Sequence, residues 1–167
     1  MQGLGNDFMV IDAVHQSFEA NAEQIQAWAD RHRGVGFDQL LIVAKATDSA
    51  ADFRYRIFNA DGSEVEQCGN GARCLARFIF EQGLSEKRCL NLQTIKGLMS
   101  TERISRDTVK VSLGVPTIES QSKTLLIGNN EYVVHLIDVG NPHVVIVVDD
   151  LTSIDVAGIG QQIETHP

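Results

Sequence analysis

Hydrophobic and polar residues alternate along much of the chain, and a period of two is typical of strands with one buried face. Phe53, Tyr55 and Ile57 are apolar, while Arg54 and Arg56 between them are charged, which predicts a strand over 53–58. Similar patterns and short apolar runs predict further strands at 8–11, 40–43, 89–94, 98–104, 108–113, 131–138 and 143–148.

Three segments carry the signals of helices. Asn21 is followed three residues later by Gln24, the spacing of a capping box, and the helix that it opens is expected to reach about residue 31. A short helix is expected at 153–165, and another lies in the middle of the chain. Because strands outnumber these helices, the predicted class is α+β.

The middle helix starts directly behind a cysteine. Apolar residues recur over 72–79 at the 3, 4 and 7 spacing of one helical face, which places Cys68 and the amides of 69–71 at or beside the helix N-terminus. Such amides lack an intrahelical partner and carry partial positive charge, so they favour a thiolate and a bound carboxylate. A helix opened by glycines behind a small buried cysteine explains the same residues, and the local pattern leaves both interpretations open.

The composition is that of a soluble globular protein, with 43% hydrophobic and 22% charged residues. The strand rhythm pauses at 114–116, which predicts a first domain at 1–113 and a further segment at 114–167. A net charge of −8 argues against binding to nucleic acids or anionic membranes. Since the sequence shows neither a membrane-spanning apolar run nor a secretory leader, we expect a cytoplasmic protein.

The cysteines and histidines limit the possible chemistry. Three cysteines without metal-like spacing make a disulfide framework or a zinc site improbable, and Cys74 and Cys89 are expected in the core. Among the five histidines, His143 alone lies in a polar turn. A pair of Cys68 and His143 would suit a cysteine hydrolase, or His143 would only tune the thiol; spacing does not decide between these.

Four loops are rich in glycine and amide side chains, at 3–7, 36–39, 59–62 and 140–143. Each adjoins an apolar strand, so we expect each at a sheet end. Asn and Gln both donate and accept hydrogen bonds, which suits a zwitterionic ligand. Turn preferences explain any one loop, but four such loops and the helix-start cysteine together favour a ligand site.

The chain resembles the diaminopimelate epimerase family in long, collinear motifs. They are Gly3-Leu4-Gly5-Asn6-Asp7-Phe8, Gly34-Val35-Gly36-Phe37-Asp38-Gln39, Tyr55-Arg56-Ile57-Phe58-Asn59-Ala60-Asp61-Gly62-Ser63-Glu64, Gln67-Cys68-Gly69-Asn70-Gly71-Ala72-Arg73-Cys74 and Gly140-Asn141-Pro142-His143. The resemblance implies a mixed sheet wrapped around a central helix, as a first domain followed by the start of a second, similar one.

The same resemblance implies a racemase without pyridoxal phosphate, other cofactor or metal. It would interconvert LL- and meso-2,6-diaminopimelate, on the route to lysine and peptidoglycan, with two cysteines as thiolate base and thiol acid. We also expect a homo-oligomer, most simply a dimer. The implied site residues are Cys68 as one acid/base, Gly69 and Asn70 at the α-carboxylate, Asn6, Gln39, Asn59 and Asn141 around the substrate, and His143 as a modulator of cysteine acidity.

The chain departs from the family pattern in two ways. The family's second cysteine lies in a Cys-Gly-(Ser or Thr)-Gly segment that this sequence does not contain, and Gly114-Val115-Pro116 stands where Gly-Glu-Pro is usual. We therefore expect the chain alone to be inactive, with exposed edges that promote self-association. The alternative is a non-catalytic module, derived from the epimerase, that binds an amino acid or a partner.

Overall fold

A curled mixed sheet makes up most of the first unit of the chain. The computed structural model describes residues 1–19, 21–66 and 68–166, and it divides into two compact units, Met1–Leu113 and Gly114–Pro167. In the described part of the first unit, seven strands follow one another across the sheet in chain order. They are β1 (Gln2–Gly3), β2 (Asn6–Ala13), β3 (Gln39–Lys45), β4 (Phe53–Asn59), β5 (Cys89–Thr94), β6 (Gly97–Arg103) and β7 (Val109–Val111).

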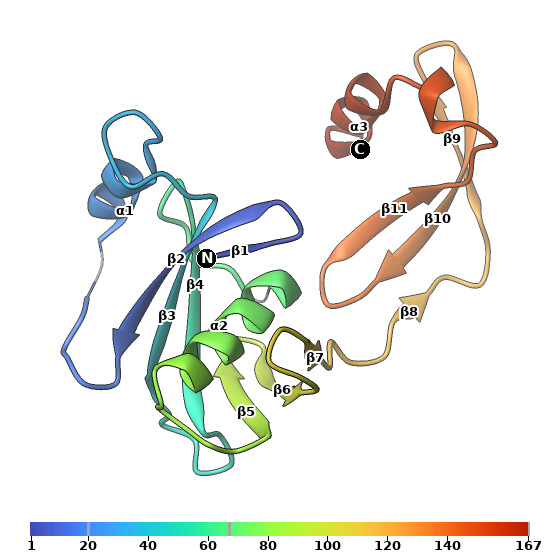
Figure 1. Cartoon of the computed structure of the whole chain (residues 1–167). Coiled ribbons are helices and arrows are strands. Elements are labelled where there is room, and N and C mark those ends of the chain that lie inside the picture. Colours follow the sequence, from blue (N-terminus) through green and yellow to red (C-terminus); the bar gives the residue numbers. More distant parts are fainter. Residues whose placement is uncertain (20, 67, 167) are drawn as a thin grey trace. The chain divides into compact units, whose positions relative to one another are not determined.

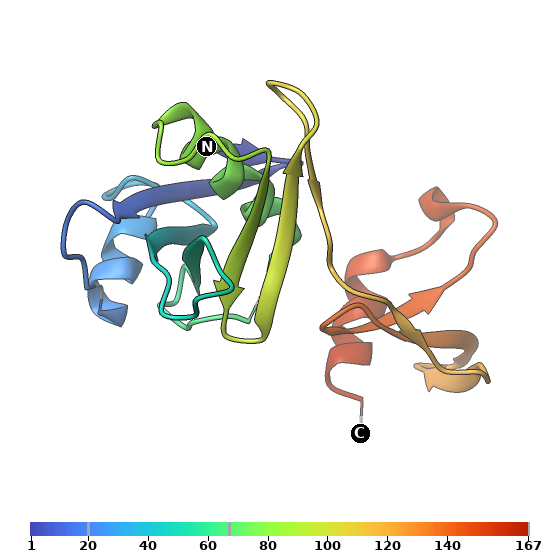
Figure 2. The ribbon, with the colours of Figure 1, turned by 90° about the horizontal axis from the view of Figure 1, so that it is seen from below.

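Neighbouring strands are antiparallel except for two pairs. β2 runs parallel to β3, and β4 runs parallel to β5. Parallel neighbours need a long crossover connection, and here the two crossovers carry the helices α1 (Ala22–Ala29) and α2 (Gly69–Glu81). Figure 2 shows β5 and β6 as the yellow-green antiparallel pair that continues the sheet after the second crossover.

Helix α2 lies against the concave face of this sheet (Figure 1). Its apolar stripe, with Ala72, Leu75 and Ile79 fully buried, packs on inward-pointing strand residues such as Leu41 and Tyr55. The predicted helix after Cys68 is thereby confirmed, and so is the burial of Cys74 within it. The expected α+β class, with a mixed sheet wrapped around a central helix, is confirmed as well.

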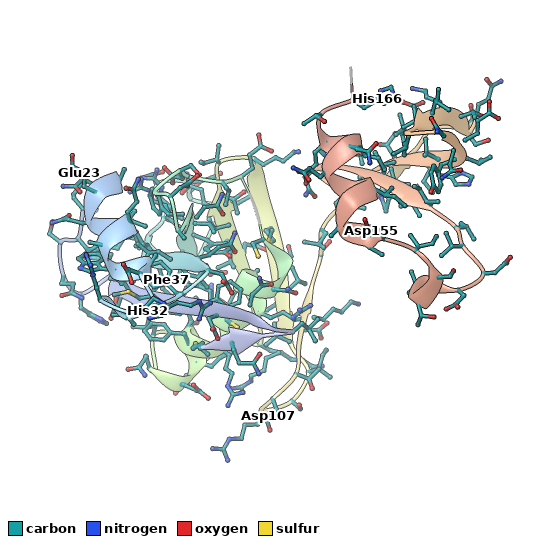
Figure 3. The ribbon with its side chains drawn as sticks, turned by 90° about the horizontal axis from the view of Figure 1, so that it is seen from above. Glu23, His32, Phe37, Asp107, Asp155 and His166 are labelled. Carbon is teal, nitrogen blue, oxygen red and sulfur yellow. The ribbon has the colours of Figure 1, made fainter. Side chains whose placement is uncertain are left out.

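Helix α1 covers the opposite face of the sheet. Ile25 and Ala29 pack with Phe37 and the outward residues of β3, and Figure 3 labels Phe37 within this layer. The capping box of Asn21 and Gln24 is present as predicted. The helix ends at Ala29, two residues before the expected end, because the chain turns back there and the amides of residues 35 and 36 donate to the Trp28 carbonyl.

The glycine-rich start of the chain is a hairpin, although the sequence predicted a loop over 3–7. β1 and β2 pair with Gly3 opposite Asn6. Leu4 and Gly5 form the two-residue turn, with φ values of 53° and 93°. Two consecutive positive φ values match the twist of the flanking strands, so this turn favours pairing. Asn6 consequently begins a strand and does not lie in a flexible loop.

The second unit contains a smaller antiparallel sheet. Its long central strand, β10, pairs with β11 on one side and with β8 and β9 on the other. A helix expected at 153–165 is in fact a 3-10 turn followed by a shorter helix, because Asp155 caps the later start by accepting from the Gly158 amide (Figure 3). The elements are β8 (Thr117–Ile118), β9 (Lys123–Ile127), β10 (Asn130–Asp138), β11 (Pro142–Ile146), a 3-10 turn (Leu151–Ser153) and α3 (Val156–Glu164).

Strand β9 was not predicted, yet its hairpin signal is present in the sequence. Ile127 pairs with Asn130, so Gly128 and Asn129 form a two-residue turn in which Gly128 has a φ of 61°. Glycine and asparagine are the residues that adopt this backbone conformation most readily. The residues before the turn are apolar without a clear alternation, which hid the strand.

One further expectation about a single residue is wrong. Cys89 is exposed and not in the core, because β5 alternates and directs Leu90 and Leu92 inward instead. Among the described helices, none is long and apolar enough to cross a membrane.

The packing of α2 predicts a large effect of trimming its buried face. Leu75 has no exposed surface, so Leu75→Ala is expected to lower the free energy of unfolding by about 2–5 kcal/mol through lost burial and a residual cavity. The matched control is Leu98→Ala, because Leu98 is 51% exposed. Denaturant unfolding that gave both variants equal stability would contradict this packing.

Candidate functional site

Three amide side chains meet at one edge of the first sheet. Asn6 begins β2, Gln39 begins β3, and Asn59 ends β4. Since β2 and β3 are parallel and β4 is antiparallel to β3, these three ends share one edge. Alternation places all three on the face that α2 covers, because each lies two residues from a strand residue of the α2 core, namely Phe8, Leu41 and Ile57.

Helix α2 starts at the same edge, with Cys68 as its N-cap. The cysteine backbone is extended, with φ −144° and ψ 113°, and its Sγ accepts from the Gly71 amide at 3.3 Å. The Cys68 carbonyl accepts from the Ala72 amide at 2.8 Å. The amides of Gly69 and Asn70 occupy the first helical positions, where a helix offers them no partner. A half-buried thiol and two such amides therefore lie together, a setting that suits a carboxylate.

Asn70 ties the helix start to the first strands. Its side-chain Nδ2 donates to the Asn6 side-chain Oδ1 at 2.8 Å, and its own Oδ1 accepts from the Arg73 guanidinium. Asn6 and Asn70 are both half-buried. This pair fixes the orientation of each side chain, and it places Arg73 one turn into the helix as a nearby positive charge.

Gln39 and Asn59 form the second amide pair. They are direct neighbours across β3 and β4, and the Gln39 side-chain Nε2 donates to the Asn59 side-chain Oδ1 at 3.0 Å. The Asn59 side-chain Nδ2 donates to Ser63 Oγ at 3.3 Å. The structure thus brings Asn6, Gln39, Asn59, Cys68 and the 69–70 amides to one edge, as the sequence suggested for these loops. Gln67, the first residue of the cysteine motif, lies outside the described residues.

An ion pair braces the turn after Asn59. Arg56 makes a two-pronged contact with Glu64, with Nε–Oε1 at 2.7 Å and an Nη–Oε2 hydrogen bond at 2.9 Å. The Arg56 hydrogen bond holds the pKa of the Glu64 carboxyl below its usual value, against the opposing effect of partial burial. The pair closes the 59–63 turn and so helps to hold Asn59 at the sheet edge.

A second brace lies beside Gln39. The Asp7 amide donates to the Asp38 carboxylate at 2.8 Å, and Arg31 bridges the carboxylates of Asp7 and Asp38. The hydrogen bond from the Asp7 amide is the main cause that lowers the pKa of Asp38, and the hydrogen bond from Arg31 adds to it. These contacts join the starts of β2 and β3, so that Asn6 and Gln39 keep their places.

Asn141 and His143 belong to the second unit. Asn141 lies in the turn between β10 and β11, and His143 is the second residue of β11, paired with Ile137. The His143 Nδ1 lies 2.9 Å from the Asn141 carbonyl oxygen, and both residues are exposed within their unit. The ring is therefore oriented by its own turn.

Two residues with a direct bearing on the site were not singled out from the sequence. The Tyr55 hydroxyl donates to the Cys68 carbonyl at 3.3 Å, and Arg73 binds Asn70. The i, i+3 spacing of Asn70 and Arg73 on one helix could have indicated their contact from the sequence. Tyr55 and Cys68 are thirteen residues apart, and only the fold brings them together. Burial raises the pKa of the Cys74 thiol. In the described part of the chain, no three His, Cys, Asp or Glu side chains gather as metal ligands.

Comparison with known sequences shows the family of the chain. A sequence model described as "Diaminopimelate epimerase" matches residues 1–119. The chain belongs to the diaminopimelate epimerase family. It is 47% identical to the diaminopimelate epimerase of Aromatoleum aromaticum over 178 residues, and 47% identical to that of Neisseria meningitidis over 181 residues. These alignments cover 100% and 99% of this chain, but only 64% of each relative.

Solved structures share the fold at low sequence identity. A probable proline racemase from Agrobacterium radiobacter K84 superposes with a TM-score of 0.67 at 17% identity, over 95% of this chain and 51% of that one. A Bacillus anthracis phenazine biosynthesis protein of the PhzF family gives 0.63 at 24% identity, over 91% and 53%. At these identities the likeness concerns the fold alone.

The Arg56–Glu64 brace predicts a stability contribution that depends on pH. Because the folded pKa of Glu64 lies below its usual value, the contribution is full above the usual carboxyl pKa and is lost as the pH falls through the lower folded value. Glu64→Gln is therefore expected to destabilise the chain at neutral pH, and its deficit should shrink below about pH 4. Glu86→Gln, at an exposed carboxylate, is the control, and a deficit for Glu64→Gln that did not change with pH would refute the assignment.

Proposed function

We propose that this chain provides one half of a cofactor-independent epimerase that interconverts LL- and meso-2,6-diaminopimelate. The observation that carries the proposal is the Cys68 thiol at the start of α2, on the Gly71 amide and at the sheet edge that also holds Asn6, Gln39 and Asn59. The family provides the substrate, since the relatives that the chain matches are diaminopimelate epimerases.

Proton removal from an amino-acid α-carbon needs strong stabilisation of the carbanion. In the proposed reaction, the amides of Gly69 and Asn70 hold the α-carboxylate at the positive end of α2, where negative charge develops. The Cys68 thiolate accepts the α-proton on one face of the carbon, and a thiol on the other face donates a proton to it. In the reverse direction, Cys68 is the thiol that donates.

The remaining candidate residues have positioning roles in this proposal. Asn6, Gln39 and Asn59 offer both donors and acceptors, which suits the ammonium and carboxylate groups of the substrate. Asn141 would be a further substrate contact, and His143 would modulate the acidity of a cysteine. We treat 1–113 as an N-terminal epimerase-like domain and 114–167 as the start of a second, similar one.

The second acid/base is the missing partner in this scheme. The described cysteines other than Cys68 do not qualify, since Cys74 is buried with a raised pKa and Cys89 is exposed on β5. A thiol from outside these 167 residues would complete the reaction. Three free cysteines are usual in a reducing compartment, which agrees with a cytoplasmic enzyme. The alternative function is an amino-acid-binding or partner module that kept the half-site without catalysis.

The scheme predicts that the purified chain binds diaminopimelate but does not invert it. Inversion needs a second proton donor, so no meso product is expected from the LL isomer by chiral chromatography. Measurable inversion that disappears in Cys68→Ala, but not in Cys89→Ala, would contradict the need for a second thiol. Deuterium uptake at the α-carbon without inversion would favour the epimerase over the binding module.

Binding itself is tested by protection of the thiol. Diaminopimelate at millimolar concentration is expected to slow alkylation of Cys68 by iodoacetamide, followed peptide by peptide in a mass spectrometer. Cys89 in the same sample serves as the internal control. 1,5-Diaminopentane, which has the same carbon spacing between its amines but no carboxylate, should give no protection. Unchanged Cys68 alkylation in the presence of diaminopimelate would count against both readings.

We further propose that the chain associates with itself, most simply as a dimer. β11 pairs with a described strand on one side only, and its Val144 and Val145 are 39% and 38% exposed. An open strand edge with apolar side chains promotes pairing between chains. Light scattering should therefore give a mass above 18.3 kDa, and Val145→Lys should lower it more than Leu4→Lys does. A monomer at all concentrations would refute this proposal.

A further inference from the structure

The Cys68 peptide is held from the sheet side by a buried hydroxyl. Tyr55 is 2% exposed in the core between β4 and α2, and its hydroxyl donates to the Cys68 carbonyl at 3.3 Å. The same carbonyl accepts from the Ala72 amide at 2.8 Å, while Sγ accepts from the Gly71 amide at 3.3 Å. The N-cap cysteine is therefore fixed through both its backbone and its side chain.

Only glycine at position 71 leaves room for this arrangement. A Cβ on Gly71 would lie 2.3 Å from the Tyr55 hydroxyl oxygen and 3.0 Å from Leu41 Cδ2. Real Cβ atoms do not approach other atoms to 2.3 Å, so any other residue would displace the hydroxyl. Gly71 thus has two functions here, since its amide binds the thiol and its bare Cα admits the tyrosine.

The hydroxyl is a dependable donor. Burial raises the pKa of Tyr55 well above its usual value, and the nearby Cys68 and Cys74 sulfurs add to this effect. Tyr55 is therefore protonated at neutral pH, and its hydroxyl donates the hydrogen bond to the Cys68 carbonyl.

We propose that Tyr55 is a positioning residue for the Cys68 thiol. By donating to the Cys68 carbonyl through the space left open at Gly71, it holds the cysteine in the extended N-cap conformation that places Sγ on the Gly71 amide. The inference rests on the proposed role of Cys68 as acid/base. It goes beyond that role by assigning the residue that keeps the thiol aimed at the helix N-terminus.

The experiment compares Cys68 alkylation in Tyr55→Phe and in Tyr132→Phe, both in a Cys89→Ser background. The phenyl ring keeps the core filled, so only the hydroxyl is lost. Two ionisable side chains interact with Cys68, namely Tyr55 from β4 and Cys74 from α2. Cys74 is retained in every variant, so the comparison isolates the effect of the Tyr55 hydroxyl. The measured quantity is the rate of Cys68 alkylation at neutral pH divided by the rate at strongly alkaline pH. This ratio is expected to fall about fivefold in Tyr55→Phe, which corresponds to one net hydrogen bond.

Dividing the two rates cancels changes in exposure of the sulfur, because both rates share them. An unchanged ratio in Tyr55→Phe, in a chain that is fully folded by circular dichroism, would overturn the proposal. An equal fall in Tyr132→Phe would also overturn it. No diaminopimelate is present, so a failure of the epimerase proposal leaves this result untouched.

A second set of variants tests the space at Gly71. Gly71→Ala should lower the denaturant midpoint strongly, and adding Tyr55→Phe should recover part of the loss, since the phenyl ring removes the oxygen that the new methyl meets. The Cys68 rate ratio should stay low in the double variant, because the hydroxyl is still absent. Strictly additive midpoints, or a restored rate ratio, would contradict the shared role of Gly71 and Tyr55.

Discussion

The burial of α2 inside the curled sheet is the interaction on which the rest of the first unit depends. The stripe of Ala72, Leu75, Ala76 and Ile79 is completely buried, and such burial is the dominant favourable contribution to folding. The two alanines keep the helix close to the strands. This close packing sets the height of the helix above the sheet, and with it the place where the helix begins.

The inner face of the sheet changes character at its edge. The inward residues Phe8, Leu41 and Ile57 belong to the core, and the next inward residues toward the strand ends are the amides Asn6, Gln39 and Asn59. Half-buried amides are costly unless they are hydrogen-bonded. Here they are paired, Gln39 with Asn59 and Asn6 with Asn70. The polar layer can therefore sit directly on the hydrophobic core, without a flexible loop between them.

Much of this arrangement could be read from the sequence. The period of the residues after Gly71 placed the helix and put Cys68 at or beside its N-terminus, and alternation found most strands. The family motifs named the candidate residues that the fold then gathered at one edge. The first hairpin, β8 and β9 were not recognised, because these strands are short or lack alternation and the two hairpin turns are signalled by single glycines. Cys89 was misplaced because one cysteine in an apolar run does not reveal which face of a strand it occupies.

Pairing between strands also constrains how this chain can change during evolution. Each amide reaches the helix side of the sheet because it lies two positions along the strand from a core residue on that side. One inserted or deleted residue inside β2, β3 or β4 would turn the amide to the other face, toward α1. The connections at 14–19 and 46–52 lie outside the strands, so a change in their length leaves the amides on the same face. Sequence length should therefore vary in those connections and stay constant within the strands, even where the identity of the core residues drifts.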